Sequence, residues 1–285
     1  AEWKSLENTD FENPAMKGGS VEPLCTTKWN QSWPYNKFCP EQSASWASNG
    51  HVVVGCVATA MAQIMAYWDY PTQGTGSHSY IPICNSQEHG CWHTPSYPQQ
   101  SVNFGATTYD WENMVDQIDA SSPVEQIDAI ATISYHCGVA VDMMYDHHGD
   151  GSGAYSEDVI TAIKNYFDYA QTTITYQQMT PTWDVMLVES LDRSVPVYYA
   201  GQSDEGGGHA FVCDGYDENG LFHFNFGWGG SSDGYFTTSA MEYHNSSSAV
   251  FNFVPSTVYN STAKAPTSLN VTPAANNELK ATVTW

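Results

Sequence analysis

The sequence predicts an α+β domain with two lobes, one helical and one built of antiparallel strands. Two observations carry this prediction. Apolar residues recur at three- and four-residue steps in the first half, and short alternating runs separated by turn residues fill the second half. Helices that precede strands, rather than alternating with them, are typical of this class. A chain of 285 residues with 41% hydrophobic residues can also bury a sizeable core.

The spacing of apolar residues predicts four helices. The clearest covers 56–68, with apolar residues on one face and Pro71 just beyond its end. The other three cover 122–138, 156–167 (with Ser156 as its N-terminal cap) and 181–193. Five strands are predicted at 195–201, 209–216, 221–228, 234–240 and 249–254, the second and third joined by a hairpin turn at 217–220.

The charge balance excludes several classes of partner. The chain has 31 acidic and 8 basic residues, which gives a net charge of −23 with histidine neutral. With so few Lys and Arg side chains, the chain is poorly suited to binding the phosphates of nucleic acid. An anionic membrane surface would repel it for the same reason. No apolar run approaches the roughly 20 residues needed to span a bilayer. We therefore expect neither a nucleic-acid nor a membrane partner.

Changes in composition divide the chain into four parts. Residues 1–20 are polar and are interpreted as a leader or the remnant of a pro-segment. Residues 21–255 form the predicted working domain, and 256–268 a linker rich in Pro, Ser, Thr and Ala. Residues 269–285 alternate like two short strands around an Asn-Asn turn. They look like the opening of a fibronectin type III or similar β-sandwich module.

Cys56 and His209 are the candidate nucleophile and general base. Cys56 begins the best predicted helix, where unpaired N–H groups favour a thiolate, and Gly55 leaves room for a substrate carbonyl. His209 follows three glycines and begins a strand, so a chain-like substrate could lie across its imidazole. Taken singly, Cys56 could be a small buried residue and His209 a histidine at a strand entrance. Together they are the two residue types that thiolate–imidazolium catalysis requires.

Two further roles complete such a site. Asn225, on the returning hairpin strand, is a candidate to orient the imidazole, although flat pairing would place it opposite Asp214 and only a bulge would bring it closer. The Cys56 N–H and a side-chain amide could bind the oxyanion. Gln31 is a candidate for that amide, and by position alone Gln42 and Gln63 are equally good.

Several long motifs resemble the streptopain and interpain family of bacterial papain-like cysteine peptidases. They are PLCTTKWNQSWPYNKFCP, GCVATAMAQIMAYWDYP, GGHAFVCDGYD and FHFNFGWGGSSDGYF, in matching order across roughly 21–255. The resemblance implies a papain-like fold with Cys56 as nucleophile, His209 as base, Asn225 beside it and Gln31 in the oxyanion hole. Phe226 stands where the family has tryptophan. The candidate substrate contacts are Gly207, Gly208, Ser152 and Trp228.

The resemblance further implies a secreted bacterial endopeptidase that works through a thioester acyl-enzyme, without a metal or organic cofactor. Proteins or peptides would be its substrates, with a hydrophobic side chain preferred two residues before the cut bond (P2). An N-terminal pro-segment would inhibit the precursor. Two alternatives remain open: an acyltransferase that uses the same Cys–His pair, and a weakly active protein-binding module.

Seven cysteines leave at least one thiol unpaired. Cys84 and Cys91 could form a local disulfide, or could bind zinc together with His89 and His93, although the spacing matches no usual zinc motif. Further predictions are a Cys25–Cys39 disulfide and buried, unreactive thiols at Cys137 and Cys213. The loop 145–153 carries Asp146, His147, His148 and Asp150, which suggest either a calcium site or a solvated loop at the rim of the cleft.

Overall fold

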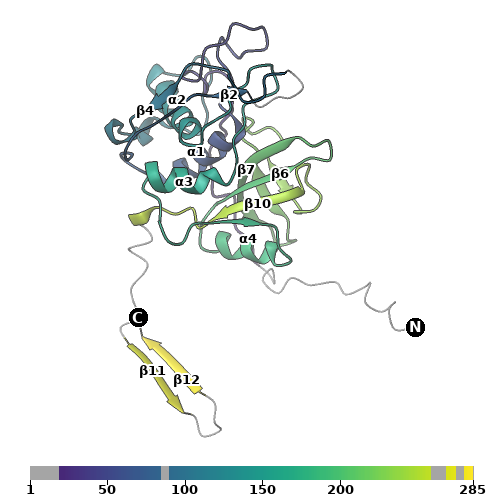
Figure 1. The fold of residues 1–285 in the computed structure, drawn as a ribbon. Helices are drawn as coiled ribbons and strands as arrows, with labels where there is room; N and C mark the ends of the chain where they lie inside the picture. Colours follow the sequence, from purple (N-terminus) through teal and green to yellow (C-terminus); the bar gives the residue numbers. More distant parts are fainter. Residues whose placement is uncertain (1–18, 85–89, 258–267, 274–278, 285) are drawn as a thin grey trace, which may run out of the picture.

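A computed structural model describes residues 19–84, 90–257, 268–273 and 279–284. The helices are α1 (Cys56–Trp68), α2 (Val124–Ala140), α3 (Asp158–Tyr166) and α4 (Trp183–Leu191), with 3-10 turns η3 (Phe104–Ala106) and η4 (Trp111–Asn113). The predicted two-lobed α+β fold is confirmed: α1–α3 lie in one lobe, and a sheet with α4 on its far side forms the other (Figure 1).

The second lobe is a six-stranded antiparallel sheet in the order β5-β10-β6-β7-β8-β9. Its strands are β5 (Thr175–Gln178), β6 (Val197–Gln202), β7 (Gly208–Tyr216), β8 (Phe222–Asn225), β9 (Gly234–Phe236) and β10 (Asn245–Phe251). The five predicted strands are all present, and β5 is an edge strand that the sequence did not predict. The predicted strand over 221–228 stops at Asn225, because the chain then turns through Gly227, with φ +69°.

The two faces of the sheet belong to two hydrophobic clusters, because side chains alternate along each strand. On β7, Ala210 and Val212 pack with α1 and α2, whereas Phe211 and Cys213 pack with α4. Helix α1 is buried along nearly its whole length, from Val57 to Met65, because it lies between α2 and β7. The start of α1 is therefore held rigidly beside the sheet.

The predicted cap of the third helix is wrong. Glu157, not Ser156, takes the capping position of α3, and no side chain caps it. The Ser156 hydroxyl instead lies 2.8 Å from the Tyr198 hydroxyl, because the chain here packs against β6. Short strands complete the helical lobe: β1 (His78–Tyr80) pairs with β4 (Gln100–Val102), and β2 (Ile83–Cys84) with β3 (Thr94–Pro95).

The proposed divisions at the ends of the chain fall mostly outside the described residues, which exclude 1–18 and 258–267. After the predicted linker, β11 (Ser268–Pro273) and β12 (Leu279–Thr284) pair antiparallel, as the alternation predicts, with Ser268 opposite Thr284. The Asn-Asn turn between them lies outside the described residues. Within the described part of the chain, no helix combines the length and apolar character needed to cross a membrane.

Candidate active site

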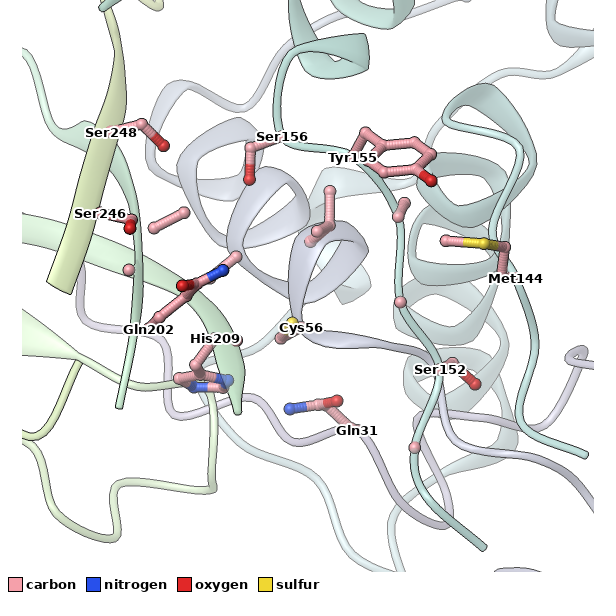
Figure 2. A pocket seen from close by; sticks show the side chains of 18 of the residues that line it. Gln31, Cys56, Met144, Ser152, Tyr155, Ser156, Gln202, His209, Ser246 and Ser248 are labelled. Atoms are coloured by element: carbon pink, nitrogen blue, oxygen red, sulfur yellow. The ribbon is translucent and has the colours of Figure 1, made fainter. Parts of the chain in front are cut away.

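Cys56 and His209 line one cavity between the two lobes, with a volume of about 640 Å³. Cys56 stands at the start of α1, and His209 lies on β7 (Figure 2). Ser152 and Tyr155 lie on one side of this cleft, and Gln202 and the β10 serines lie on the other (Figure 2). The cleft is therefore open enough for an extended chain to pass over the sulfur.

Burial raises the pKa of the Cys56 thiol, and this is the largest effect upon it. Hydrogen bonding from the backbone of Ala210, Val57 and Cys56 itself lowers the pKa by less. The sequence predicts that the helix N-terminus favours a thiolate, but in the folded protein desolvation outweighs that contribution. The thiol therefore needs a base to take its proton.

Gly55 has a backbone conformation that only glycine adopts easily, with φ +95°. A Cβ there would lie 2.7 Å from the Met143 side chain and 3.0 Å from the Ser152 carbonyl oxygen. Glycine is thus required by the packing of the helix start against the cleft wall, in addition to any need for substrate access.

We predict that Gly55→Ala destabilises the protein more than Gly50→Ala. Both glycines have positive φ, but an added Cβ at Gly50 meets nothing within 4 Å. The Gly50 variant should lose roughly 1–2 kcal/mol of unfolding free energy from backbone strain. The Gly55 variant should lose about 1–3 kcal/mol more through overpacking, together with activity. Equal losses in urea unfolding would contradict this packing role.

His209 is held by a backbone carbonyl. Its Nε2 lies 2.8 Å from the carbonyl oxygen of Phe226, and because a carbonyl only accepts, Nε2–H is the donor. Nδ1 of the neutral ring then keeps its lone pair and can accept a proton. Trp228 stacks on the imidazole with ring centroids 4.5 Å apart, and Tyr243 lies 5.0 Å away.

Burial among these rings lowers the pKa of His209 to about 4, against a partly compensating rise from the Phe226 carbonyl. Only 7% of the residue's surface is exposed. Desolvation disfavours the imidazolium, so the ring is neutral at neutral pH. Burial thus shifts the pKa of each group toward its uncharged form, and the bond from Nε2 leaves Nδ1 as the acceptor nitrogen of the ring.

The predicted contact between Asn225 and the imidazole is wrong. The required bulge is present: pairing shifts between Cys213 and Gly215, so Asn225 lies opposite Val212 instead of Asp214. Its amide, however, is hydrogen-bonded to other groups. Nδ2 donates to the Thr27 carbonyl at 2.7 Å, and Oδ1 accepts from Gln63 and from the Gly227 N–H. Asn225 thus anchors the turn that presents the Phe226 carbonyl.

Asp233 supports the same turn, with Oδ1 2.8 Å from the Phe226 N–H. The Phe226 ring is nearly parallel to His209, at 11° and 6.1 Å between centroids. Because the residue binds His209 through its backbone, replacing tryptophan by phenylalanine leaves that bond intact. The sequence gives little indication that the Phe226 carbonyl binds His209. The only hint is the group of glycines at 227, 229 and 230, which turn the chain directly after a strand.

Of the three amide candidates, only Gln31 lines the cavity with Cys56. Its side-chain nitrogen is directed toward the gap between Cys56 and His209 (Figure 2). The Gln31 carbonyl accepts from the Val54 N–H at 2.9 Å, which ties this segment to the chain entering α1. Gln42 instead donates to the Tyr97 hydroxyl.

Gln63 is fully buried on α1 and connects the two sides of the site. Its Oε1 accepts from the Thr27 hydroxyl at 3.1 Å and from the Trp29 N–H at 3.2 Å. Its Nε2 donates to Asn225 Oδ1 at 3.0 Å. One amide therefore joins the segment leading to Gln31 and the turn that holds His209. The sequence offered Gln63 only as an alternative oxyanion group.

The predicted substrate contacts separate into two groups. Gly208 and Ser152 line the cavity, whereas Gly207 and Trp228 are not among its lining residues. The Ser152 hydroxyl is engaged within the protein, donating to the Val53 carbonyl at 2.7 Å. Trp228 packs against the imidazole ring. Backbone, rather than these side chains, is thus available to a substrate at Ser152 and Gly208.

We predict that Gly208→Ala and Gly153→Ala raise KM severalfold without destabilising the protein. Added Cβ atoms at these cavity-lining positions meet no protein atom within 4 Å, so they would occupy space that an extended substrate needs. Alanine should leave the unfolding free energy unchanged or raise it by up to about 1 kcal/mol. Gly207→Ala, outside the lining, is the control. Peptide kinetics that show equal KM in all three variants would contradict this path for the substrate.

The cysteine predictions meet different outcomes. The local Cys84–Cys91 disulfide is confirmed. The Cys25–Cys39 disulfide is wrong, since both thiols are free and buried in the core. Cys137 and Cys213 are buried with their pKa raised by desolvation, as expected of unreactive thiols. His89 lies outside the described residues.

The loop 145–153 is organised by a buried carboxylate rather than solvated throughout. Asp146 accepts hydrogen bonds from the N–H groups of four residues that follow it: His148, Gly149, Asp150 and Gly151. Backbone donors engage both of its oxygens, so Asp146 acts as a cap of this loop. The loop does lie at the rim, since Asp150 and Gly151 line the cleft.

Comparison with known proteins identifies the family. The model of the Peptidase C10 family matches residues 29–236. This chain belongs to the Peptidase C10 family. Streptopain of Streptococcus pyogenes is 33% identical over 257 residues, which cover 84% of this chain and 61% of that protein. The thiol protease/hemagglutinin PrtT of Porphyromonas gingivalis is 35% identical over 211 residues, which cover 73% of this chain and 22% of that protein.

Solved structures agree with the C10 assignment. Active wild-type interpain A of Prevotella intermedia superposes with a TM-score of 0.71 at 34% identity, covering 84% of this chain and 96% of that one. An alanine mutant of a prointerpain A fragment from the same organism gives a TM-score of 0.70 at 34% identity, covering 84% of this chain and 74% of the fragment. The chain spans less than two thirds of the length of streptopain and of PrtT.

Proposed function

We propose that this C10 family chain is a secreted bacterial cysteine endopeptidase that hydrolyses peptide bonds through a thioester acyl-enzyme. The observation that carries the proposal is the pair of Cys56 and His209 in one cleft, with Nε2–H of the imidazole bound to Phe226 and Nδ1 left as acceptor. Membership of a peptidase family and the thiol protease relatives support the same activity.

The first half of the reaction would form the acyl-enzyme. His209 Nδ1 takes the thiol proton as the Cys56 sulfur attacks the peptide carbonyl carbon. The negative oxygen is stabilised by the Cys56 N–H and the Gln31 amide. The imidazolium then gives its proton to the leaving amine, and the C–N bond breaks to leave a thioester on Cys56.

Water completes the cycle. The neutral His209 accepts a proton from water as that water attacks the thioester, and the proton returns to the departing sulfur. The carboxylic acid product leaves, and both groups return to their initial protonation states. The proposed role of Asn225 in this cycle is that of a positioning residue, which acts through the turn that carries Phe226.

Three finer proposals accompany this one. The preference for a hydrophobic P2 side chain is supported by Val57, Ala154 and Ala200 in the cavity lining, although Gln178 and Ser248 make the wall mixed. An inhibitory pro-segment is suggested by the name of the prointerpain A relative. Secretion fits the acidic, disulfide-bonded chain.

The product identifies the activity. We expect the protein to cut a peptide in the presence of an added primary amine and release mainly free carboxylates, which mass spectrometry distinguishes from amide products. A thiol-directed epoxide inhibitor should modify Cys56 and none of the buried thiols, and Cys56→Ala should abolish both cleavage and labelling. Mainly amide products would establish an acyltransferase, and the absence of both labelling and cleavage would leave a binding module.

A further inference from the structure

A second group of cysteine and histidine side chains lies at the rim of the cleft, apart from Cys56 and His209, and its two cysteines are joined as the Cys84–Cys91 disulfide. The potential ligand atoms of Cys84, Cys91 and His148 all lie within 4.8 Å of one another. Cys91 Sγ is 3.1 Å from His148 Nε2. Cys84 is buried, and the other two are half-buried. Two sulfurs and an imidazole are the donor set that Zn²⁺ prefers.

The fold brings these side chains together from two separate segments. Cys84 ends β2, whose pairing with β3 is extended by a bond from the His93 N–H to the Cys84 carbonyl. His148 comes from the loop capped by Asp146, which is itself only 6% exposed. The His148 imidazole is thus held by a loop whose backbone is fixed by hydrogen bonds to Asp146.

The distances suit a metal once the thiols are free. A tetrahedral ion with Zn–S bonds of about 2.3 Å and Zn–N bonds of about 2.0 Å holds its ligand atoms about 3.5–3.8 Å apart. The three atoms here already lie within 4.8 Å, so small side-chain rotations would suffice. The fourth position would be open to water.

We propose that Cys84, Cys91 and His148 bind one Zn²⁺ ion when the Cys84–Cys91 disulfide is reduced, and that the disulfide form does not bind it. Two molecules of a small thiol supply two electrons: the protein disulfide becomes two thiols, and the reductant becomes its own disulfide. Binding then replaces two thiol protons by Zn²⁺, and two protons go to solvent. The proposal does not depend on peptidase activity.

The position of the site gives it a consequence for the cleft. A cavity of about 210 Å³ beside the cluster is lined by Cys84 and His148 and shares Met144, Gly151 and Gly153 with the substrate cavity. A bound ion would fasten the segment around Cys84 to the loop that forms this rim.

The test uses the full chain with Cys56→Ala, which removes the other thiol–imidazole pair as a metal ligand. After reduction by a phosphine and desalting, Co²⁺ should give a sulfur-to-cobalt charge-transfer band, and Zn²⁺ should displace it at one ion per chain. Competition with a chromophoric chelator gives the affinity for Zn²⁺. In thermal unfolding, Zn²⁺ should stabilise the reduced protein and leave the disulfide form unaffected.

Variants decide which residues bind. His148→Asn, Cys84→Ser and Cys91→Ser should each weaken Zn²⁺ binding at least tenfold. His93→Asn, a matched control on a nearby histidine outside the cluster, should leave the affinity unchanged. The proposal is overturned if reduced protein binds no Zn²⁺, if the disulfide form binds equally well, or if His148→Asn binds like its parent.

Discussion

Replacing His209 by asparagine is expected to lower kcat/KM by about 10²- to 10⁴-fold, the range for removal of a general base. The loss should be large here because burial raises the pKa of the Cys56 thiol, so little thiolate forms without a base. Asparagine removes the titratable ring while leaving an uncharged polar side chain of smaller size at this position. Progress curves on a peptide substrate measure the effect.

The same variant should make the protein less sensitive to acid. In the folded state the pKa of His209 is lowered to about 4, whereas in the unfolded chain it has its ordinary value near 6.5. The unfolded state therefore binds a proton first as the pH falls, and the free energy of unfolding drops between about pH 6.5 and 4. Complete protonation of His209 corresponds to a loss of about 3 kcal/mol in the free energy of unfolding. The His209→Asn variant should not show this loss.

His136→Asn is the matched control, because burial also lowers the pKa of His136 to about 4. That imidazole lies on α2, hydrogen-bonded to the Tyr109 hydroxyl at 3.0 Å and outside the cleft lining. The His136→Asn variant should make the protein less sensitive to acid without the large loss of kcat/KM. Denaturant unfolding at several pH values measures the acid sensitivity of each variant, and peptide kinetics measure its kcat/KM. Near-normal kcat/KM in His209→Asn would refute its role as base.

Gln63→Met is expected to lower kcat/KM by about 10²-fold, because a displacement near 1 Å at a reacting group has a cost of that order. Methionine has a similar size but leaves the Trp29 N–H and the Thr27 hydroxyl without their buried acceptor, and Asn225 without one donor. Unpaired buried groups should lower the free energy of unfolding by about 2–4 kcal/mol.

Gln63→Glu separates the two sides of this connection. The carboxylate keeps an acceptor for Trp29 but loses the Nε2 donor to Asn225, so it should mainly disturb the turn that holds His209. Gln42→Met, which removes a bond to the Tyr97 hydroxyl, should leave kcat unchanged. If Gln63→Met loses stability but keeps the kcat and pH profile of the parent, its role is structural only.

Much of the fold follows from local patterns. The apolar spacing over 56–68 and the turn chemistry at 217–220 place Cys56 at a helix start and His209 on a central strand. The family motifs then predict that Cys56 and His209, about 150 positions apart in sequence, lie in one site. Hydrophobic periodicity alone does not predict this pairing. The helices were predicted well because each buries a regular apolar face.

The remaining features depend on tertiary contacts. Strand β5 is polar and partly exposed, so only its pairing with β10 makes it a strand. The Phe226 carbonyl is a backbone atom, which no side-chain motif reports, and the bulge at Asp214 changes the partner of Asn225. The pKa of Cys56 reflects how deeply α1 is packed, which the sequence alone does not show.

Alkylation of Cys56 by iodoacetamide, followed by mass spectrometry in the parent and in His209→Asn, tests most directly whether this sulfur loses its proton to this imidazole. The buried free thiols at Cys25, Cys39 and Cys137 serve as internal references. The account predicts that at neutral pH Cys56 reacts about 100-fold faster in the parent than in the variant. Equal rates of alkylation at Cys56 in the two proteins would contradict it.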